Sequence, residues 1–393
     1  MVSKFFRRIF NTALIGTMCL LLGLTFTMTA FAASPGDVGV WADTTSLPQN
    51  LSYANSVTYG GYAYVIGGDN GGSLVNTVYY APLNLNGTVG AWTATTTLPQ
   101  TLSASTSVVY NGYVYVMGGQ HGALVNTVYS APLNPDGTVG AWTTSVVNTL
   151  PQTINGSTSI AYDGYIYVMG GFNSTYQNTV YSAPVNDGTV GVWATSLNTL
   201  PKGLQDSSAI TYNGYAYVIG GFGSSGFSNA VYSAPLGSNG TIGTWATSPN
   251  TLPQGLDGHN AVSYGGYAYV IGGRGSSGFS SGFSNAVYSA PFGPNGTIGT
   301  WATSPNTLPQ PLQYASAITY NGYVYNIGGS DIGVYVDDVY FAQLTGLPPP
   351  PSPGQPAPVA APNTGFSQVS YLPAALVVVA GVGLVIIARR RYS

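Results

Sequence analysis

The chain is poor in charged residues and almost free of cysteine. Only 8 of its 393 residues are Lys or Arg, and all 11 acidic residues are Asp. Between residues 33 and 345, Lys202 and Arg274 stand against eleven aspartates, which gives this part a formal charge of −9. Phosphate backbones are bound through many basic side chains, so this balance argues against a nucleic-acid partner. The single cysteine, Cys19, lies near the N-terminus, which leaves the body without disulfides or thiol chemistry.

The absence of glutamate and the scarcity of lysine also bear on secondary structure, because both residues favour helices. The chain is instead rich in Gly (54 residues) and Tyr (31 residues), with abundant Thr and Val. β-Branched and aromatic residues favour strands, and Gly is typical of turns. The composition therefore predicts an all-β fold.

A repeat of about 50 residues organises the body of the chain. Each unit ends in a phrase of the type Gly-Thr-Val-Gly-Ala-Trp. Two other phrases, Tyr-x-Gly-Tyr-x-Tyr-Val-x-Gly-Gly and Asn-x-Val-Tyr-x-Ala-Pro, lie between successive tryptophans. The six tryptophans of the chain are Trp41, Trp92, Trp142, Trp193, Trp245 and Trp301. A period of this length is typical of propellers and solenoids.

The second unit shows what each repeat folds into. We expect strands at residues 106–110, 113–117, 127–131 and 138–142, with a tight hairpin turn at Asn111-Gly112. Four short antiparallel strands per unit make one propeller blade, so the sequence predicts a six-bladed β-propeller of four-stranded blades over residues 33–345. The tryptophans, tyrosines and paired glycines that recur in every unit are then core and turn residues rather than sites.

These residues resemble the kelch repeat, in which a diglycine ends the second strand and a spaced Tyr and Trp follow. The diglycines are Gly67-Gly68, Gly118-Gly119, Gly170-Gly171, Gly220-Gly221, Gly272-Gly273 and Gly328-Gly329. The matching tyrosines are Tyr79, Tyr129, Tyr181, Tyr232, Tyr288 and Tyr340. The spacing from Tyr to Trp is longer than is usual in the family, and the Arg often found after the Leu-Pro pair is absent. The resemblance is therefore to a bacterial variant of the kelch type.

The two ends of the repeat region predict how the ring closes. The region opens with a fourth-strand phrase, residues 37–41, before any first strand. The last unit, residues 315–344, has only three strands. We therefore expect the N-terminal strand to complete the last blade, which removes exposed sheet edges.

The first 32 residues have the pattern of a secretory signal peptide. Lys4, Arg7 and Arg8 precede an apolar run, and Ala30-Phe31-Ala32 resembles a cleavage site. An uncleaved N-terminal membrane anchor is the alternative. Either interpretation predicts export of the propeller.

The C-terminal region predicts a second attachment to the envelope. Residues 346–371 form a Pro-rich stalk, residues 372–388 an uncharged apolar run suited to a transmembrane helix, and residues 389–393 a basic cytoplasmic tail. The stalk contains Ala361, Pro362, Asn363, Thr364 and Gly365, which with the helix and tail resemble a cell-wall sorting signal. The resemblance implies cleavage after Thr364 by a sortase-type transpeptidase, although the family usually has Leu where Ala361 stands. A plain single-pass anchor is the alternative, and both place the propeller outside the cell.

Candidate binding residues gather on one face of the predicted ring. Strands alternate in direction, so the loop after each second strand lies on the same face as the connection to the next blade. That face receives every Lys, Arg and His of the body, several aromatics and four aspartates (Asp69, Asp206, Asp257 and Asp331). The candidates that we take from it are His121, Phe172, Tyr176, Lys202, Phe222, Phe227, His259, Arg274, Phe279, Phe283, Tyr314 and Asp331. Aromatic rings beside amides and carboxylates suit sugars or extended peptides.

These observations favour a binding or adhesion module for a surface glycan or a partner protein. Two histidines in different units and no cysteine form neither a nucleophile arrangement nor a metal-ligand pattern, so we expect no enzyme activity, no cofactor and no metal. Two alternatives stay open. One is a carbohydrate-active enzyme of the sialic-acid mutarotase type, which has a similar fold and would use Arg274 with a carboxylate. The other is a structural surface-coat protein.

Overall fold

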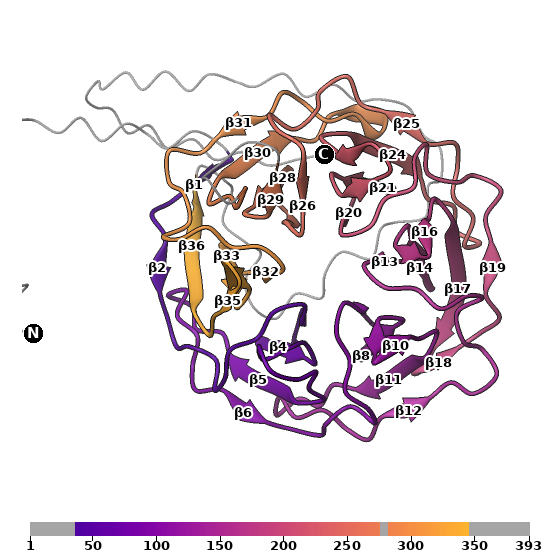
Figure 1. Ribbon diagram of the computed structural model, residues 1–393, viewed down its shortest axis with the longest axis horizontal. Helices are drawn as coiled ribbons and strands as arrows, with labels where there is room; N and C mark the ends of the chain where they lie inside the picture. Colours follow the sequence, from indigo (N-terminus) through magenta and orange to yellow (C-terminus); the bar gives the residue numbers. More distant parts are fainter. Residues whose placement is uncertain (1–35, 276–281, 346–393) are drawn as a thin grey trace, which may run out of the picture. The chain divides into compact units, whose positions relative to one another are not determined.

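The computed structural model describes residues 36–275 and 282–345, in which six antiparallel sheets surround a central channel (Figure 1). Blade 1 contains β3 (Asn55–Tyr59), β4 (Tyr62–Ile66), β5 (Val78–Pro82) and β6 (Thr93–Ala94). Blade 2 contains β7 (Thr106–Tyr110), β8 (Tyr113–Met117), β11 (Val128–Pro132) and β12 (Thr143–Thr144). Blade 3 contains β13 (Thr158–Tyr162), β14 (Tyr165–Met169), β17 (Val180–Asn186), β18 (Thr189–Val190) and β19 (Ala194–Thr195). Blade 4 contains β20 (Ser208–Tyr212), β21 (Tyr215–Ile219), β24 (Val231–Pro235) and β25 (Ala246–Thr247). Blade 5 contains β27 (Asn260–Tyr264), β28 (Tyr267–Ile271), β30 (Val287–Pro291) and β31 (Ala302–Thr303). Blade 6 contains β32 (Ser316–Tyr320), β33 (Tyr323–Ile327), β36 (Val339–Thr345), β1 (Asp37–Val38) and β2 (Ala42–Asp43). The prediction of an all-β, six-bladed propeller is confirmed.

Short hairpins decorate one end of the blades. They are β9 (Gln120–His121) with β10 (Ala123–Leu124), β15 (Phe172–Asn173) with β16 (Thr175–Tyr176), β22 (Phe222–Gly223) with β23 (Gly226–Phe227), and β34 (Ser330–Asp331) with β35 (Val334–Tyr335). In blade 5 the corresponding pair is not a hairpin, since β26 (Leu256–Asp257), which precedes the first strand of the blade, pairs with β29 (Arg274–Gly275). One 3₁₀ turn, η1 (Pro294–Gly296), is also present. Within the described ranges no helix is long and apolar enough to cross a membrane. The predicted signal peptide, stalk, sorting-like motif, transmembrane helix and basic tail all lie outside these ranges, as does Phe279.

The innermost hairpin of each blade forms as its turn pair dictates. Asn111 and Gly112 have φ values of 49° and 80°, and the equivalent pairs of the other blades are also left-handed. Two successive positive φ values define the type I′ turn, whose twist matches that of a two-stranded ribbon. Each turn therefore fixes the register of the strand that lines the channel, as Tyr110 opposite Tyr113 shows.

The core lies between neighbouring blades, and the diglycines make this packing possible. Gly118 lies so close to the backbone of the next blade that a Cβ atom there would be 2.7 Å from the carbonyl oxygen of Ile154. The amide of Gly119 donates to that same carbonyl at 2.7 Å. Apolar clusters fill the spaces between blades. The second strand of each blade contributes one fully buried tyrosine: Tyr64, Tyr115, Tyr167, Tyr217, Tyr269 and Tyr325. The structural interpretation of these repeated residues is therefore supported.

The fourth strand was predicted too early in the repeat. In blade 2 the expected strand at residues 138–142 makes only a single bridge, between Val139 and Leu133, and the paired strand β12 follows the tryptophan. The cause is the proline that ends β11. Gly140 passes over Pro132 so closely that a Cβ atom would lie 2.6 Å from the proline ring, which interrupts the ladder before β12 resumes it.

The two ends of the repeat region meet in one sheet. Val38 of β1 is opposite Leu344 of β36, and Ala42 of β2 is opposite Phe341 of the same strand. Blade 6 is therefore built from segments about 300 residues apart in the sequence (Figure 1). The six innermost strands also contact one another in turn, with β3 beside both β7 and β32.

Candidate functional site

The loops that carry the candidate residues lie on one face because the inter-blade connections pair with the loops that follow the diglycines. Gln205 bridges to Phe222 in blade 4, and Gln313 bridges to Ser330 in blade 6. In blade 5 the same pairing joins β26 to β29, which places Asp257 opposite Arg274. These backbone pairs bring the connections and the short hairpins to one end of the channel.

A closed ring of six backbone hydrogen bonds surrounds the channel at this end. One residue of each connection donates its amide to the carbonyl of the same position in the preceding blade, at 2.8–3.1 Å. In order around the ring these residues are Tyr53, Ala104, Gly156, Asp206, Gly258 and Tyr314. All six have φ between 49° and 57°, a left-handed conformation that costs non-glycine residues about 1 kcal/mol or more each. We call this set the mouth ring.

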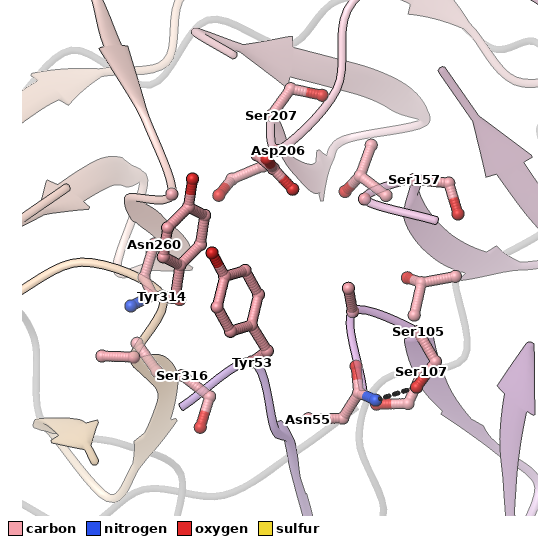
Figure 2. A pocket seen from close by; sticks show the side chains of 18 of the residues that line it. Tyr53, Asn55, Ser105, Ser107, Ser157, Asp206, Ser207, Asn260, Tyr314 and Ser316 are labelled. Atoms are coloured by element: carbon pink, nitrogen blue, oxygen red, sulfur yellow. Dashed lines mark hydrogen bonds between the residues drawn. The ribbon is translucent and has the colours of Figure 1, made fainter. Parts of the chain in front are cut away.

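The side chains of the mouth ring are unequal, which makes the channel entrance asymmetric. Tyr53 and Tyr314 stack with ring centroids 4.0 Å apart and an interplanar angle of 20°. Figure 2 shows both phenol rings beside the carboxylate of Asp206, while the opposite side of the entrance is open. Ala104 and Gly156 occupy that open side, since neither carries a long side chain.

Asp206 is the group of the entrance whose pKa is shifted closest to neutral pH. Burial raises the pKa of its carboxyl to about 7, and the negative charge of Asp257 adds to the rise. Arg274 and the side chain of Gln205, whose Nε2 donates to Asp206 Oδ2 at 3.2 Å, oppose it. A carboxyl with this pKa is present in both its acidic and its basic form near neutral pH.

Arg274 interacts electrostatically with Asp206 and is held by an ion pair with Asp257. Its Nη2 donates to Asp257 Oδ2 at 2.8 Å and its Nε donates to Asp257 Oδ1 at 3.2 Å. Asp257 is fully buried, so its charge must be paired, and this two-point geometry is the strong form of the guanidinium–carboxylate pair. The charge of Arg274 is therefore balanced within the protein.

Four of the predicted aromatic residues form a continuous row beside Arg274. The ring of Tyr176 contacts both Phe172, at 5.4 Å between centroids, and Phe222, at 5.8 Å. Phe222 contacts Phe227 at 5.0 Å, and the guanidinium of Arg274 lies 5.5 Å from the ring centre of Phe227. The structure thus brings together five residues that the sequence analysis chose separately in three blades.

The remaining predicted residues do not join this group. His121 is exposed on β9 and its Nδ1 contacts the hydroxyl of Thr101 at 2.7 Å. Lys202 is exposed in the connection before blade 4, and Phe283 bridges to Arg274 through the backbone. Asp331 is partly buried in β34. His259 is buried against Gly220, and burial lowers its pKa to about 4, so it is a neutral packing group.

Two hollows meet at the mouth ring. The outer one, which we call the vestibule, has a volume of about 320 Å³ and is lined by Tyr53, Asp69, Leu74, Ser103, Ala104, Gln120, Asn155, Gln205, Asp206 and Tyr314. The inner one is the upper part of the channel, where every blade contributes its small polar residues, among them Asn55, Ser105, Ser157, Ser207, Asn260 and Ser316 (Figure 2). Asp206 and the stacked tyrosines belong to both, so a ligand in the vestibule would contact them.

Asp206 and Tyr53 were assigned to this face from the sequence but were not chosen as candidates. The signal that would have found them is a column of the repeat. The residue two positions after the recurrent Leu or Ile of each connection is Tyr, Ala, Gly, Asp, Gly and Tyr in successive units. This column varies strongly from unit to unit next to the recurrent Leu or Ile, and its six residues are the mouth ring.

Comparison with known proteins supports the fold and gives no close relative. No family model matches the chain, and no curated protein matches it. Among solved structures, that of YjhT matches with a TM-score of 0.61 over 75% of this chain and 95% of that chain, at 17% sequence identity. At this identity the likeness shows a shared propeller fold.

The expectation that the protein is not an enzyme is corrected by this comparison. YjhT is a sialic acid mutarotase, so a fold shared with it gives no ground for excluding catalysis. The sequence analysis rejected catalysis because it looked for nucleophile and metal patterns. It kept catalysis by Arg274 with a carboxylate only as an alternative, because the pKa of a single carboxyl depends on its surroundings in the fold rather than on its neighbours in sequence.

Proposed function

We propose that this protein is a carbohydrate-active enzyme that transfers protons at a reducing sugar bound in the vestibule, as in the interconversion of anomers. The observation that carries the proposal is the carboxyl of Asp206, with a pKa of about 7, at the entrance of a polar hollow. Fold likeness to a mutarotase supports the same class of reaction.

Anomer interconversion needs only proton transfers and rotation. A base takes the proton of the anomeric hydroxyl while an acid protonates the ring oxygen, the ring C–O bond breaks, and the open-chain carbonyl form closes on its other face. Every atom is conserved. In this scheme the ionised form of Asp206 takes the hydroxyl proton and its neutral form returns one, a role that a pKa near the working pH suits.

Tyr53 and Tyr314 are placed to assist. Burial raises the pKa of both phenols, so they stay protonated donors at neutral pH. Their stacked rings form a fixed wall beside Asp206, against which the apolar face of a sugar ring could pack (Figure 2). A hydroxyl donor directed at the ring oxygen would favour the opening step.

The test is exchange between anomers, measured by NMR magnetisation transfer on a panel of reducing sugars with the purified full-length protein. We expect catalysed exchange, and we expect Asp206→Asn to lower the rate by a factor of about 10² or more. Asp163→Asn is the matched control, because the equivalent turn position holds Asn in three other blades (Asn111, Asn213 and Asn321). Equal exchange in both variants would remove Asp206 from the mechanism.

A second candidate is glycan binding without turnover, which the row of Phe172, Tyr176, Phe222 and Phe227 favours. Binding that Phe222→Ala weakens and Asp206→Asn leaves unchanged, in the absence of any exchange, would support it. Kelch-type ancestry and display on the cell surface remain proposals from the sequence. Export and anchoring depend on residues outside the described ranges, and labelling of the intact cell surface would test them.

A further inference from the structure

We propose that the vestibule selects neutral, hydroxyl-rich sugars and discriminates against acidic ones. This inference rests on the proposed function, because it assigns a substrate class to the same site. It comes from the balance of charge around Asp206 rather than from the fold.

The first observation is the chemistry of the vestibule wall. Two carboxyl groups, Asp69 and Asp206, line it, together with the amides of Gln120, Asn155 and Gln205. No Lys, Arg or His belongs to this lining among the residues described. Amides and hydroxyls form hydrogen bonds with sugar hydroxyls as both donors and acceptors. A substrate carboxylate would instead be repelled by the negative charge of ionised carboxyl groups in the wall.

The second observation is that the nearest cation is already neutralised. Arg274 is engaged by Asp257 through two hydrogen bonds, and Asp257 is fully buried. The pair carries no net charge, so ionised Asp206 leaves the entrance negative. Lys202, the other basic residue of the propeller, is exposed beside the hairpin of β22 and β23 and lines a different hollow.

The third observation is that the channel below the mouth ring continues the same uncharged polar chemistry. Among the described residues of this wall, several serine hydroxyls are buried without a hydrogen-bond partner: Ser56, Ser157, Ser207 and Ser316. Buried hydroxyls of this kind are usually satisfied by ligand or water. Hydroxyl groups of a neutral sugar, or waters that it holds, match them without any charge to compensate.

The test compares neutral sugars (glucose, galactose and N-acetylglucosamine) with acidic sugars (N-acetylneuraminic acid and glucuronic acid) at pH 8 in the exchange assay. We expect at least one neutral sugar to exchange about tenfold faster than either acidic one. Faster turnover of an acidic sugar would overturn the inference and leave the proposed function standing.

Two variants make the charge around the vestibule less negative. Asp69→Asn removes one carboxylate of the wall and keeps the oxygen that accepts from the Gly71 amide at 2.9 Å, so folding should be unaffected. Asp257→Asn leaves the charge of Arg274 unbalanced. Both should raise the rate for acidic sugars relative to neutral ones, several-fold for Asp69→Asn and more for Asp257→Asn. An unchanged ratio in a folded Asp69→Asn variant contradicts the charge argument.

A binding measurement distinguishes the inferred substrate class from the proposed reaction. Saturation-transfer NMR with the unmodified protein reports which sugars occupy the site, whether or not they are turned over. Neutral sugars that bind, with no catalysed exchange in the unmodified protein, would support the substrate class and refute the proposed reaction. Preferential binding of N-acetylneuraminic acid would refute the substrate class, whatever the exchange rates.

Discussion

Asp206 is held in a state that costs the fold free energy. Its backbone is left-handed, with φ at 51°, and its carboxyl is partly buried within the field of a second carboxylate, Asp257. Neither feature stabilises the propeller, since Gly occupies the same ring position in two other blades, at Gly156 and Gly258. Strain and a perturbed pKa at one residue are typical of a functional position.

The first prediction concerns stability and pH. The folded pKa of Asp206, about 7, lies above its ordinary value of 3.8, so between these values the folded state holds a proton that the unfolded state has lost. This group's contribution to stability therefore falls as pH rises from about 4 to 7. Asp206→Asn removes the penalty, and its stability relative to the unmodified protein should increase by roughly 1–3 kcal/mol between pH 5 and pH 8 in urea unfolding. A difference that stays constant between pH 5 and pH 8 would show that the pKa of Asp206 is not perturbed.

The second prediction concerns the pH dependence of exchange. If ionised Asp206 is the base, the rate rises with pH through a midpoint near 7. Asp257→Asn removes a negative charge near Asp206 and leaves the positive charge of Arg274 without its partner carboxylate. Both changes favour the ionised form of Asp206. The midpoint should move to lower pH in this variant, as a pH–rate profile would show. A midpoint that stays in place would mean that Asp257 does not act on Asp206.

Single residues were the hardest feature to predict from the sequence. Arg274 and Tyr314 were chosen because they are rare or aromatic in loops, and both lie at or beside the mouth. Asp206 could not be ranked above the other aspartates, because its pKa depends on burial and on Asp257, which lies 51 positions further along the chain. A repeat shows which positions vary, but only the closed ring shows which of them meet.

Strands and turns were largely readable from the repeat, since each is set by local chemistry that recurs six times. The innermost hairpins form where Asn-Gly, Asp-Gly or Gly-Gly pairs stand, and β7 and β8 have the predicted bounds. The fourth strand failed because its position depends on a contact between Gly140 and Pro132 across the hairpin. Such a contact has no signature in the alternation of apolar residues.

The third prediction separates conformation from contact in the diglycine element. Gly118 and Gly122 have similar left-handed φ values, 62° and 69°, but a Cβ atom would have neighbours within 4 Å only at Gly118, the Ile154 carbonyl oxygen being the nearest. Gly122→Ala should cost about 1 kcal/mol for its backbone conformation alone. Gly118→Ala should cost roughly 1–3 kcal/mol more, because the next blade must move. Urea unfolding of both variants measures the difference, and equal losses would refute the role of inter-blade contact.

At the scale of the whole molecule, the propeller depends on blade 6, where distant parts of the chain share one sheet. Val38 of β1 is 2% exposed and packs in the cluster that joins blades 5 and 6, near Leu344. Asn306 extends the same link, since its Nδ2 donates to the carbonyl of Val38 at 2.8 Å. The backbone hydrogen bond between Tyr53 and Tyr314 also crosses from blade 1 to blade 6, so the mouth ring is complete only when these blades are adjacent.

The last prediction uses two valines of the same N-terminal phrase. Val40 is 78% exposed, whereas Val38 is buried, so Val40→Asp should change stability by no more than about 0.5 kcal/mol. Val38→Asp places a charge in the cluster between blades 5 and 6 and should cost about 3 kcal/mol or more. Tyr53 and Tyr314 bond across the other side of blade 6, between blades 6 and 1. Because Val38→Asp disturbs blade 6, it should also lower the exchange rate under conditions where the protein is still folded, as circular dichroism would verify. Full activity in a folded Val38→Asp variant would show that the site does not require the N-terminal strand, and that the mouth ring is held by the six innermost strands alone.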